Sequence, residues 1–226
     1  VAVAGRSLYC DETGGDYLDA FVPPEGDAKH LSVLVGDISG HGVASALLMT
    51  SARALFRSAG LKPGSLSGLA CRVNRQLSAD IGQTGNFLTL FLTVLDEDNK
   101  TLHWVRAGHD PASLYDPDTG EITELKGEGV SMGWSHLMEC EYEESTVEFS
   151  KPGQVVAVGT DGIWETANAE GELFGRERFH RVIRENAEKS PEQIVEAVFE
   201  AVHAFRGDGP REDDITLAVM KRTEEV

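Results

Sequence analysis

Cysteine, positive charge and long apolar runs are all scarce in this chain of 226 residues. The three cysteines, Cys10, Cys71 and Cys140, stand far apart without a Cys-x-x-Cys pair, which excludes a disulfide framework or a cysteine zinc site. Their odd number favours a reducing, cytoplasmic location. Only 20 Lys and Arg side chains accompany 38 Asp and Glu, and the formal charge of -18 argues against nucleic acid or an anionic membrane and favours a protein partner. No run reaches the roughly 20 apolar residues of a membrane span, so we expect no membrane insertion in this segment.

The apolar content sets the size of the core. With 41% hydrophobic residues the chain can bury a substantial core, and its length fits one domain over residues 1–226. The chain begins abruptly in a strand-like run over residues 1–10. We therefore expect a domain taken from a longer protein with an N-terminal regulatory domain.

Short β-branched runs and amphipathic stretches predict an α+β fold. Helices are expected over residues 43–59, mostly buried, and over 66–81, 176–187 and 191–205. The last has Ser190 as N-cap, Pro191 in the first turn and Gln193 as the capping partner. Strands are expected over residues 31–38, 86–95, 101–107, 113–115, 122–125, 142–149, 154–159 and 215–220. The loops are too short for crossovers, so the sheet should be largely antiparallel, with two helix pairs packed on it.

Four aspartates beside glycine at the ends of apolar runs carry the main functional signal. They are Asp16 in GGDY, Asp37 in GDISGHG, Asp161 in TDG and Asp213 in EDDIT. A carboxylate at the mouth of a strand can reach a hard cation while a neighbouring carbonyl turns inward, and such oxygen ligands suit magnesium or manganese. An isolated Asp-Gly pair is more often a turn former. The joint pattern predicts a metal-dependent enzyme that works on phosphate.

The predicted chemistry follows from the substrate. A phosphomonoester dianion repels a nucleophile and has a poor alkoxide leaving group. Two metal ions lower the pKa of a water and clamp the phosphoryl oxygens, so hydrolysis needs no serine or cysteine nucleophile.

The strings GGDY, VGDISGHGVASALLM, AGHDP, VGTDGIWE and REDDIT resemble, in order and approximate spacing, the SpoIIE-like (RsbU-type) branch of the metal-dependent protein phosphatases. These are relatives of the type 2C serine/threonine phosphatases, and the resemblance covers residues 11–220. It implies an α-β-β-α sandwich of two mainly antiparallel sheets flanked by helix pairs. It also implies hydrolysis of phosphoserine or phosphothreonine on a protein by two Mn2+ or Mg2+ ions. The implied partner is a phosphorylated regulatory protein, often an anti-anti-sigma factor of the STAS type.

The resemblance also implies a role for each acidic residue. Asp37 would bridge both ions, and the Ile38 carbonyl would complete one of them. Asp161 and Asp213 would hold the second ion, while Asp16 would act on the first through a water. Matching Asp-Asp-Ile-Thr to the family string places the ligand at Asp213 and its neighbour, residue 214, in a supporting position. Asp214 remains the alternative ligand.

Histidines and arginines near these strings leave several roles open. His41 is either a proton donor to the leaving alkoxide or a hydrogen-bonding loop residue, with the loop role slightly favoured. His109 is expected to fix the turn after a strand. The arginine that binds phosphate in eukaryotic type 2C enzymes corresponds to Glu12 here, and the unranked replacements are Arg6, Arg53 and Arg211.

Two other functions stay open besides the phosphoprotein phosphatase. A non-catalytic binding module of the same fold is disfavoured by the retained acids. A hydrolase of small phosphoesters is disfavoured because no phosphate-binding loop or basic pocket stands out. Since the helix predicted over residues 43–59 follows the Asp37 loop directly, an upstream sensor or receiver domain could switch the enzyme by shifting that helix.

Overall fold

The computed structural model describes residues 1–22, 30–40, 42–82, 85–96, 98, 100–134 and 141–224. One sheet contains β1 (Ala2–Leu8), β10 (Ile215–Lys221), β9 (Val155–Gly159), β6 (Ala112–Tyr115) and β7 (Ile122–Leu125), in that order. The other contains β2 (Tyr17–Phe21), β3 (Ser32–Ile38), β4 (Leu88–Leu95), β5 (Thr101–Ala107) and β8 (Glu144–Glu148). The helices are α1 (Val43–Ser58), α2 (Leu66–Ile81), α3 (Gly175–Asn186) and α4 (Pro191–Arg206).

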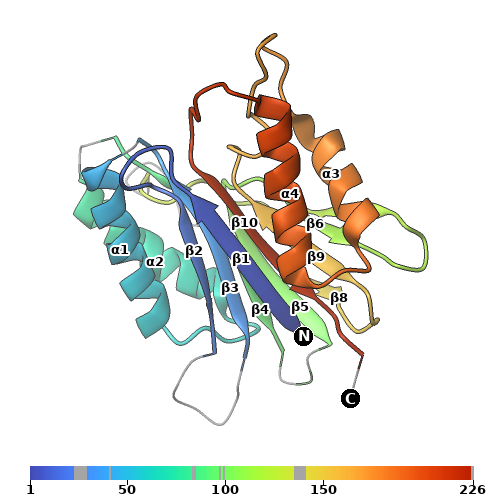
Figure 1. Cartoon of the computed structure of the whole chain (residues 1–226). Helices are drawn as coiled ribbons and strands as arrows, with labels where there is room; N and C mark the ends of the chain where they lie inside the picture. Colours follow the sequence, from blue (N-terminus) through green and yellow to red (C-terminus); the bar gives the residue numbers. More distant parts are fainter. Residues whose placement is uncertain are drawn as a thin grey trace.

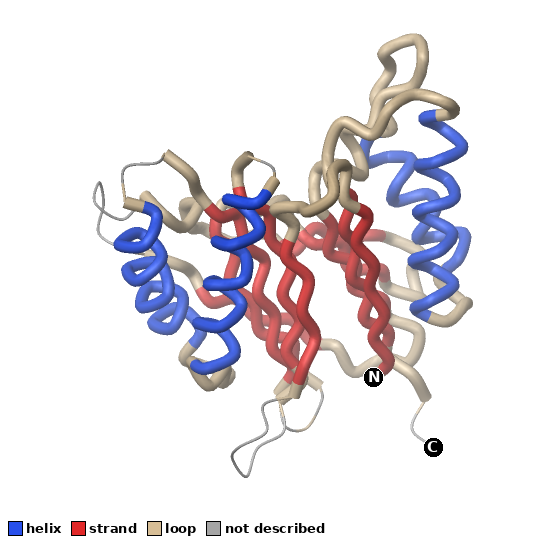
Figure 2. The backbone as a smooth tube through the Cα atoms, turned by 60° about the vertical axis from the view of Figure 1, so that its left-hand side comes forward, coloured by secondary structure: helices blue, strands red, loops and turns tan. Residues whose placement is uncertain are grey.

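The two sheets lie face to face, and each outer face is covered by one helix pair. Figure 1 shows α1 and α2 on the sheet that contains β3, with α3 and α4 on the sheet that contains β10. In Figure 2 the helices stand on opposite sides of the red strands. All strand pairs between named strands are antiparallel. The predicted α-β-β-α sandwich is confirmed.

Alternating side chains divide the core into three layers. In β3, Val33 and Val35 lie in the apolar layer between the sheets, whereas Leu34 and Ile38 pack against the helix pair α1 and α2. β10 alternates in the same way between the sheet interface and α3 and α4. Because successive residues of a strand point to opposite faces, strands buried on both faces read as continuous apolar runs. This is why the strand runs were visible in the sequence.

The prediction that the first helix is mostly buried is wrong. The buried residues of α1 are only Ser45, Ala52 and Phe56, while Val43 and Leu47 are 69% and 65% exposed. An alanine- and leucine-rich helix is apolar on every side, but only one side of a surface helix can pack against the sheet. The apolar composition therefore overstated the burial. In the described residues, no helix combines the length and apolar character that a membrane crossing requires.

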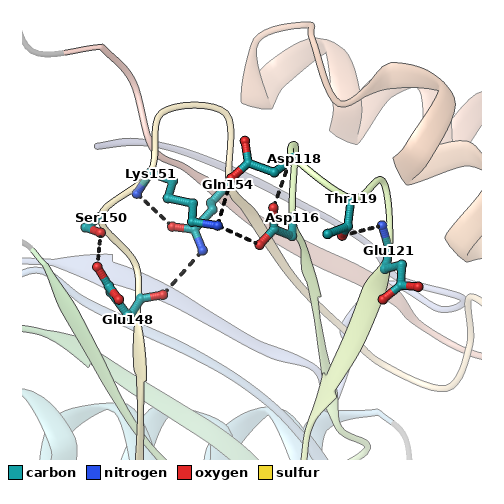
Figure 3. Close-up of polar contacts among 8 residues, drawn as sticks. All are labelled: Asp116, Asp118, Thr119, Glu121, Glu148, Ser150, Lys151 and Gln154. Carbon is teal, nitrogen blue, oxygen red and sulfur yellow. Dashed lines mark hydrogen bonds and ion pairs between the residues drawn. The ribbon is translucent and has the colours of Figure 1, made fainter.

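A charged network joins two turns at the start of β9. Lys151 Nζ lies 3.2 Å from Asp116 Oδ2 and 2.8 Å from Asp118 Oδ2, and Gln154 accepts the Lys151 backbone N–H at 2.9 Å (Figure 3). These contacts tie the β6–β7 turn to the segment between β8 and β9. Asp161 follows the opposite end of β9, so the network is remote from the predicted site.

Candidate active site

The four predicted aspartates lie where strands of both sheets begin or end. β2 and β3 are antiparallel, so Asp16 before β2 and Asp37 near the end of β3 share one sheet edge. β9 and β10 are also antiparallel, so Asp161 after β9 and Asp213 before β10 share an edge of the other sheet. Thr160 Oγ1 donates a hydrogen bond to Asp16 Oδ2 at 2.8 Å, which joins the two edges. One end of the sandwich therefore carries all four acids.

These acids repel one another. Burial raises the pKa of Asp37 to about 7, with further repulsion from Asp161, Asp213 and Asp214. Burial raises the pKa of Asp16 to about 8, and the charges of Asp37 and Asp214 add to it. The pKa of Asp161 is raised to about 6, first by burial and then by Asp213. The folded chain thus holds several carboxylates in an arrangement that favours a bound cation.

Asp16 is held by two threonines that the sequence patterns did not single out. Thr160 is completely buried, and its hydroxyl donates to Asp16 while it accepts the Thr216 backbone N–H at 3.0 Å. The pKa of Asp16 is lowered in part by hydrogen bonds from both threonines, which oppose the effect of burial. Thr160 follows the strand-end Gly159 in VGTDG, and Thr216 stands two residues after Asp214 in EDDIT. Their position beside the predicted ligands was the available signal.

Asp214 and Asp213 have different surroundings. Asp214 is 5% exposed, and its carboxylate accepts backbone N–H groups from Cys10 at 2.7 Å, Gly15 at 2.9 Å and Asp16 at 3.5 Å. Asp213 is exposed, and its Oδ1 accepts the Asp214 backbone N–H at 2.8 Å. Because the Asp214 carboxylate accepts these backbone hydrogen bonds, it holds the loop that carries Asp16 in position. The Asp214 carboxylate thus supports the Asp16 loop, and the assignment of Asp213 as the metal ligand stays a prediction.

Glycine at two positions lets the loops approach one another. A Cβ atom on Gly15 would lie 2.6 Å from the Ile38 carbonyl oxygen and 3.2 Å from that of Gly40. A Cβ atom on Gly162 would lie 2.0 Å from the Asp214 carbonyl oxygen. Any side chain at either position would push these segments apart. The Ile38 carbonyl, predicted to complete one ion, therefore faces the Asp16 loop.

His109 connects the two sheets behind the acids. It is 3% exposed, and its Nε2 lies 3.1 Å from the Gly159 carbonyl oxygen, which can only accept, so Nε2 carries the proton. Nδ1 then accepts from the Thr89 hydroxyl at 2.8 Å. Thr89 pairs with Asp37 in the β3–β4 register, and Gly159 stands two residues before Asp161. Burial lowers the pKa of His109 to about 4, so the ring is neutral and joins the two sheets through its hydrogen bonds. This is consistent with the predicted structural role.

Asp110, next to His109, forms an ion pair with the start of α3. Its carboxylate lies 2.7 Å from Arg176 Nη2, and the Arg176 guanidinium lies over the Trp164 ring at 4.1 Å from the centroid. This ion pair joins the loop after β5 to the start of α3.

A cleft of about 370 Å³ opens beside the acids. Its lining residues are Cys10, Asp11, Asp37, Gly40, Arg211, Glu212 and Asp213. A neighbouring groove of about 320 Å³ shares Arg211, Glu212 and Asp213 with the cleft and extends along the loop after Asp161. His41 lies outside the described residues, so both of its predicted roles stay predictions.

The donor atoms at this end suit a hard divalent cation. They are carboxylate and carbonyl oxygens, the ligands that magnesium and manganese prefer. A cation would also relieve the repulsion that contributes to the raised pKa values of Asp37 and Asp161. Within the described part of the chain, no group of three Asp, Glu, His or Cys side chains is close enough to enclose an ion. The residues fit ions that keep several waters, as magnesium commonly does.

Sequence comparison places these features in a family. The model described as stage II sporulation protein E (SpoIIE) matches residues 27–223. Protein IcfG of Synechocystis sp. is 25% identical over 234 residues, covering 92% of this chain and 36% of IcfG. The phosphoserine phosphatase RsbP of Bacillus subtilis is 25% identical over 142 residues, covering 62% of this chain and 34% of RsbP. The chain thus spans about a third of the length of these relatives.

Solved structures share the fold. The SiaA-PP2C domain of Pseudomonas aeruginosa has a TM-score of 0.81 at 24% identity, over 97% of this chain and 85% of that one. The catalytic domain of the serine/threonine protein phosphatase PstP, in complex with two manganese ions, has a TM-score of 0.70 at 14% identity, over 99% and 98% of the chains. The sandwich is the fold of these PP2C phosphatase domains. The family model, which matches residues 27–223, shows that the chain belongs to the SpoIIE family.

Proposed function

We propose that this chain is a metal-dependent phosphatase that hydrolyses phosphoserine or phosphothreonine on a regulatory protein. The observation that carries the proposal is the gathering of four aspartates from both sheets at one end of the sandwich, where Asp37 and Asp213 line an open cleft. A purely structural end of a sandwich would not collect carboxylates that raise one another's pKa. A non-catalytic module would have no need for such an arrangement.

The proposed ligand roles follow the chemistry of the donors. Asp37 and the Ile38 carbonyl would hold one ion, with Asp37 shared, and Asp161 and Asp213 would hold the other. Two bound Mn2+ or Mg2+ ions supply a water of lowered pKa and charge neutralisation for the phosphoryl group. Asp16 is buried and hydrogen-bonded, so it acts through a water. The PstP complex, with its two manganese ions, supports the choice of metal.

The chain's own residues fix the geometry in which this chemistry takes place. His109 and Thr160 each link the two sheets, so the carboxylates of one sheet keep their positions relative to those of the other. The Asp214 carboxylate holds the backbone of the Asp16 loop. In the proposed reaction His41 gives a proton to the leaving alkoxide or hydrogen-bonds within its loop.

The shape of the cleft favours a protein substrate. The cleft continues into the groove lined by residues 165–169 and 209–213, which has room for the chain on either side of a phosphorylated residue. A hydrolase of small phosphoesters would have no use for that groove. RsbP, named a phosphoserine phosphatase, supports the same substrate class. We propose a phosphorylated anti-anti-sigma protein of the STAS type as the partner.

We further propose an upstream sensor or receiver domain and a cytoplasmic location. The matched regions cover only 36% of IcfG and 34% of RsbP, and α1 begins directly after the Asp37 loop with Val43 and Leu47 exposed. A domain that contacts this end of α1 could move Asp37 and the Ile38 carbonyl. Equal manganese affinities of the chain and the full-length protein in every signalling state would contradict this mode of regulation.

A phosphatase assay with and without manganese tests the proposal. Wild type, Asp37→Asn and the control Asp118→Asn, which lies at the remote charged network, are compared on p-nitrophenyl phosphate and on a phosphoserine protein. We expect manganese-dependent turnover that Asp37→Asn abolishes and Asp118→Asn retains, with the phosphoserine protein preferred. Full activity in excess chelator would refute the metal mechanism. Manganese binding without turnover would favour the non-catalytic module, and preference for the small ester would favour the small-phosphoester hydrolase.

A further inference from the structure

Arg211 is the one basic side chain that lines the acidic cleft within the described residues. It shares the cleft with Asp37 and Asp213 and also borders the adjoining groove. The chain as a whole carries a formal charge of -18, so a phosphate dianion approaching this end meets mostly negative charge. A single guanidinium inside the cleft is therefore positioned to offset that repulsion.

Arg211 retains free hydrogen-bonding capacity. Its Nη1 donates to the Tyr9 carbonyl oxygen, which fixes the guanidinium against the loop before β2. Its Nε is buried and has no hydrogen-bond partner among the described residues. A buried unsatisfied donor is costly, and arginine presents five N–H groups in a rigid plane. A ligand anion with several acceptor oxygens would meet the remaining donors.

The other two candidate arginines are engaged elsewhere. Arg6 Nη1 lies 2.8 Å from Glu196 Oε2, and its guanidinium stacks over Phe199 at 4.7 Å from the ring centroid. Arg53 Nε lies 3.5 Å from the buried Asp19 carboxylate. Neither lines the cleft that contains Asp37. Of the three arginines that the sequence left unranked, only Arg211 lines the cleft that contains Asp37.

We propose that Arg211 binds the substrate phosphate in this cleft, an inference that rests on the phosphatase function proposed above. The planar guanidinium can donate two parallel hydrogen bonds to phosphate oxygens, which a lysine ammonium cannot reproduce. The Tyr9 contact orients the group before substrate arrives, which reduces the entropy lost on binding. Arg211 takes the phosphate-binding role that Glu12 cannot fill.

The experiment separates phosphate binding from turnover. Wild type, Arg211→Ala, Arg211→Lys and the control Arg6→Ala are loaded with manganese. Calorimetry measures the affinity for inorganic phosphate, and kinetics measure KM and kcat for p-nitrophenyl phosphate and a phosphoserine peptide. Manganese affinity and the thermal unfolding midpoint report on structural damage.

We expect Arg211→Ala to weaken phosphate binding and raise KM by about 10- to 100-fold, the size of a charge-assisted hydrogen bond, with kcat much less affected. Arg211→Lys should recover part of the loss, and Arg6→Ala should bind phosphate as wild type does. The inference is overturned if Arg211→Ala binds phosphate as tightly as wild type, or if Arg6→Ala loses as much phosphate affinity. It is also overturned if weaker manganese binding or a lower unfolding midpoint explains the loss in Arg211→Ala. So would a wild type that binds no phosphate.

The two proposals fail in different ways. Wild-type turnover, with KM and phosphate affinity unchanged in Arg211→Ala, would overturn the role of Arg211 and keep the phosphatase function. Arg211-dependent phosphate binding by a wild type without turnover would refute the phosphatase function and keep the role of Arg211.

Discussion

Replacing His109 with alanine removes the side chain that joins the two sheets behind the acidic cleft. The Gly159 carbonyl loses its hydrogen bond to the ring, at about 1–3 kcal/mol for a buried group left unsatisfied, and the partly buried Thr89 hydroxyl keeps only its 3.5 Å contact with the Asp37 carbonyl oxygen. The vacated space adds a further cost, so we expect a loss of about 3–5 kcal/mol in the free energy of unfolding. That is a large part of the roughly 5–15 kcal/mol of a typical domain.

Urea denaturation followed by tryptophan fluorescence measures this loss. The matched control is His180→Ala, because His180 is partly exposed and makes one hydrogen bond, at 2.9 Å, to Ser113. We expect the control to cost about 1 kcal/mol. A His109→Ala protein as stable as the His180→Ala protein would refute the bracing role.

The pH dependence of the same difference provides a second test. Burial lowers the pKa of folded His109 to about 4, whereas an unfolded histidine protonates near pH 6.5. The folded pKa is depressed, so the stability from the neutral ring is complete above about pH 6.5 and is lost as the pH falls toward 4. The stability gap between wild type and His109→Ala should therefore narrow between pH 7.5 and pH 5. A constant gap would contradict a neutral buried ring.

Three further outcomes follow from the same geometry. Gly15→Ala should lower the free energy of unfolding by about 1–3 kcal/mol and weaken manganese binding, because its Cβ would lie 2.6 Å from the Ile38 carbonyl oxygen. Denaturation measures the stability and calorimetry the manganese affinity. Unchanged values would contradict the close approach of the two loops. The pKa values of Asp16 and Asp37 are raised to about 8 and about 7, so the free energy of unfolding of the metal-free protein should fall as the pH rises from about 4 to 8. Saturating manganese should reduce this fall. A metal-free protein that gains stability over this pH range would contradict the prediction. Lys151→Ala should cost no more than about 1 kcal/mol by denaturation, because its ion pairs are partly exposed; a loss of several kcal/mol would show a larger structural role.

Periodicity and capping chemistry made much of the fold predictable. The helix α2 was predicted with its observed ends because its apolar residues repeat at helical spacing between glycine-containing turns. The capping box at Ser190 and Gln193 was also predicted, and both of its hydrogen bonds are present. These signals are local, so one sequence is enough to read them.

What was missed depends on contacts between distant segments. The strand β2 reads YLDAF, in which buried Asp19 interrupts the apolar pattern; its carboxylate is paired with Arg57, 38 residues later. The link from Thr160 to Asp16 spans 144 residues, and the bonds from Asp214 to the loop before β2 span about 200. No window along the sequence contains both partners. The order of the strings indicated which acids belong together, whereas the hydrogen bonds that hold them in place required the folded arrangement.

Calorimetric titration with Mn2+ tests the central claim, that the acids at this end of the sandwich form a metal site. The account predicts that wild type and Asp118→Asn bind Mn2+ and release protons, because Asp37 and Asp16 have raised pKa values. Asp37→Asn should bind at least about tenfold more weakly, the loss of one charged ligand. Equal binding by Asp37→Asn and wild type, or no binding by wild type, would contradict the account.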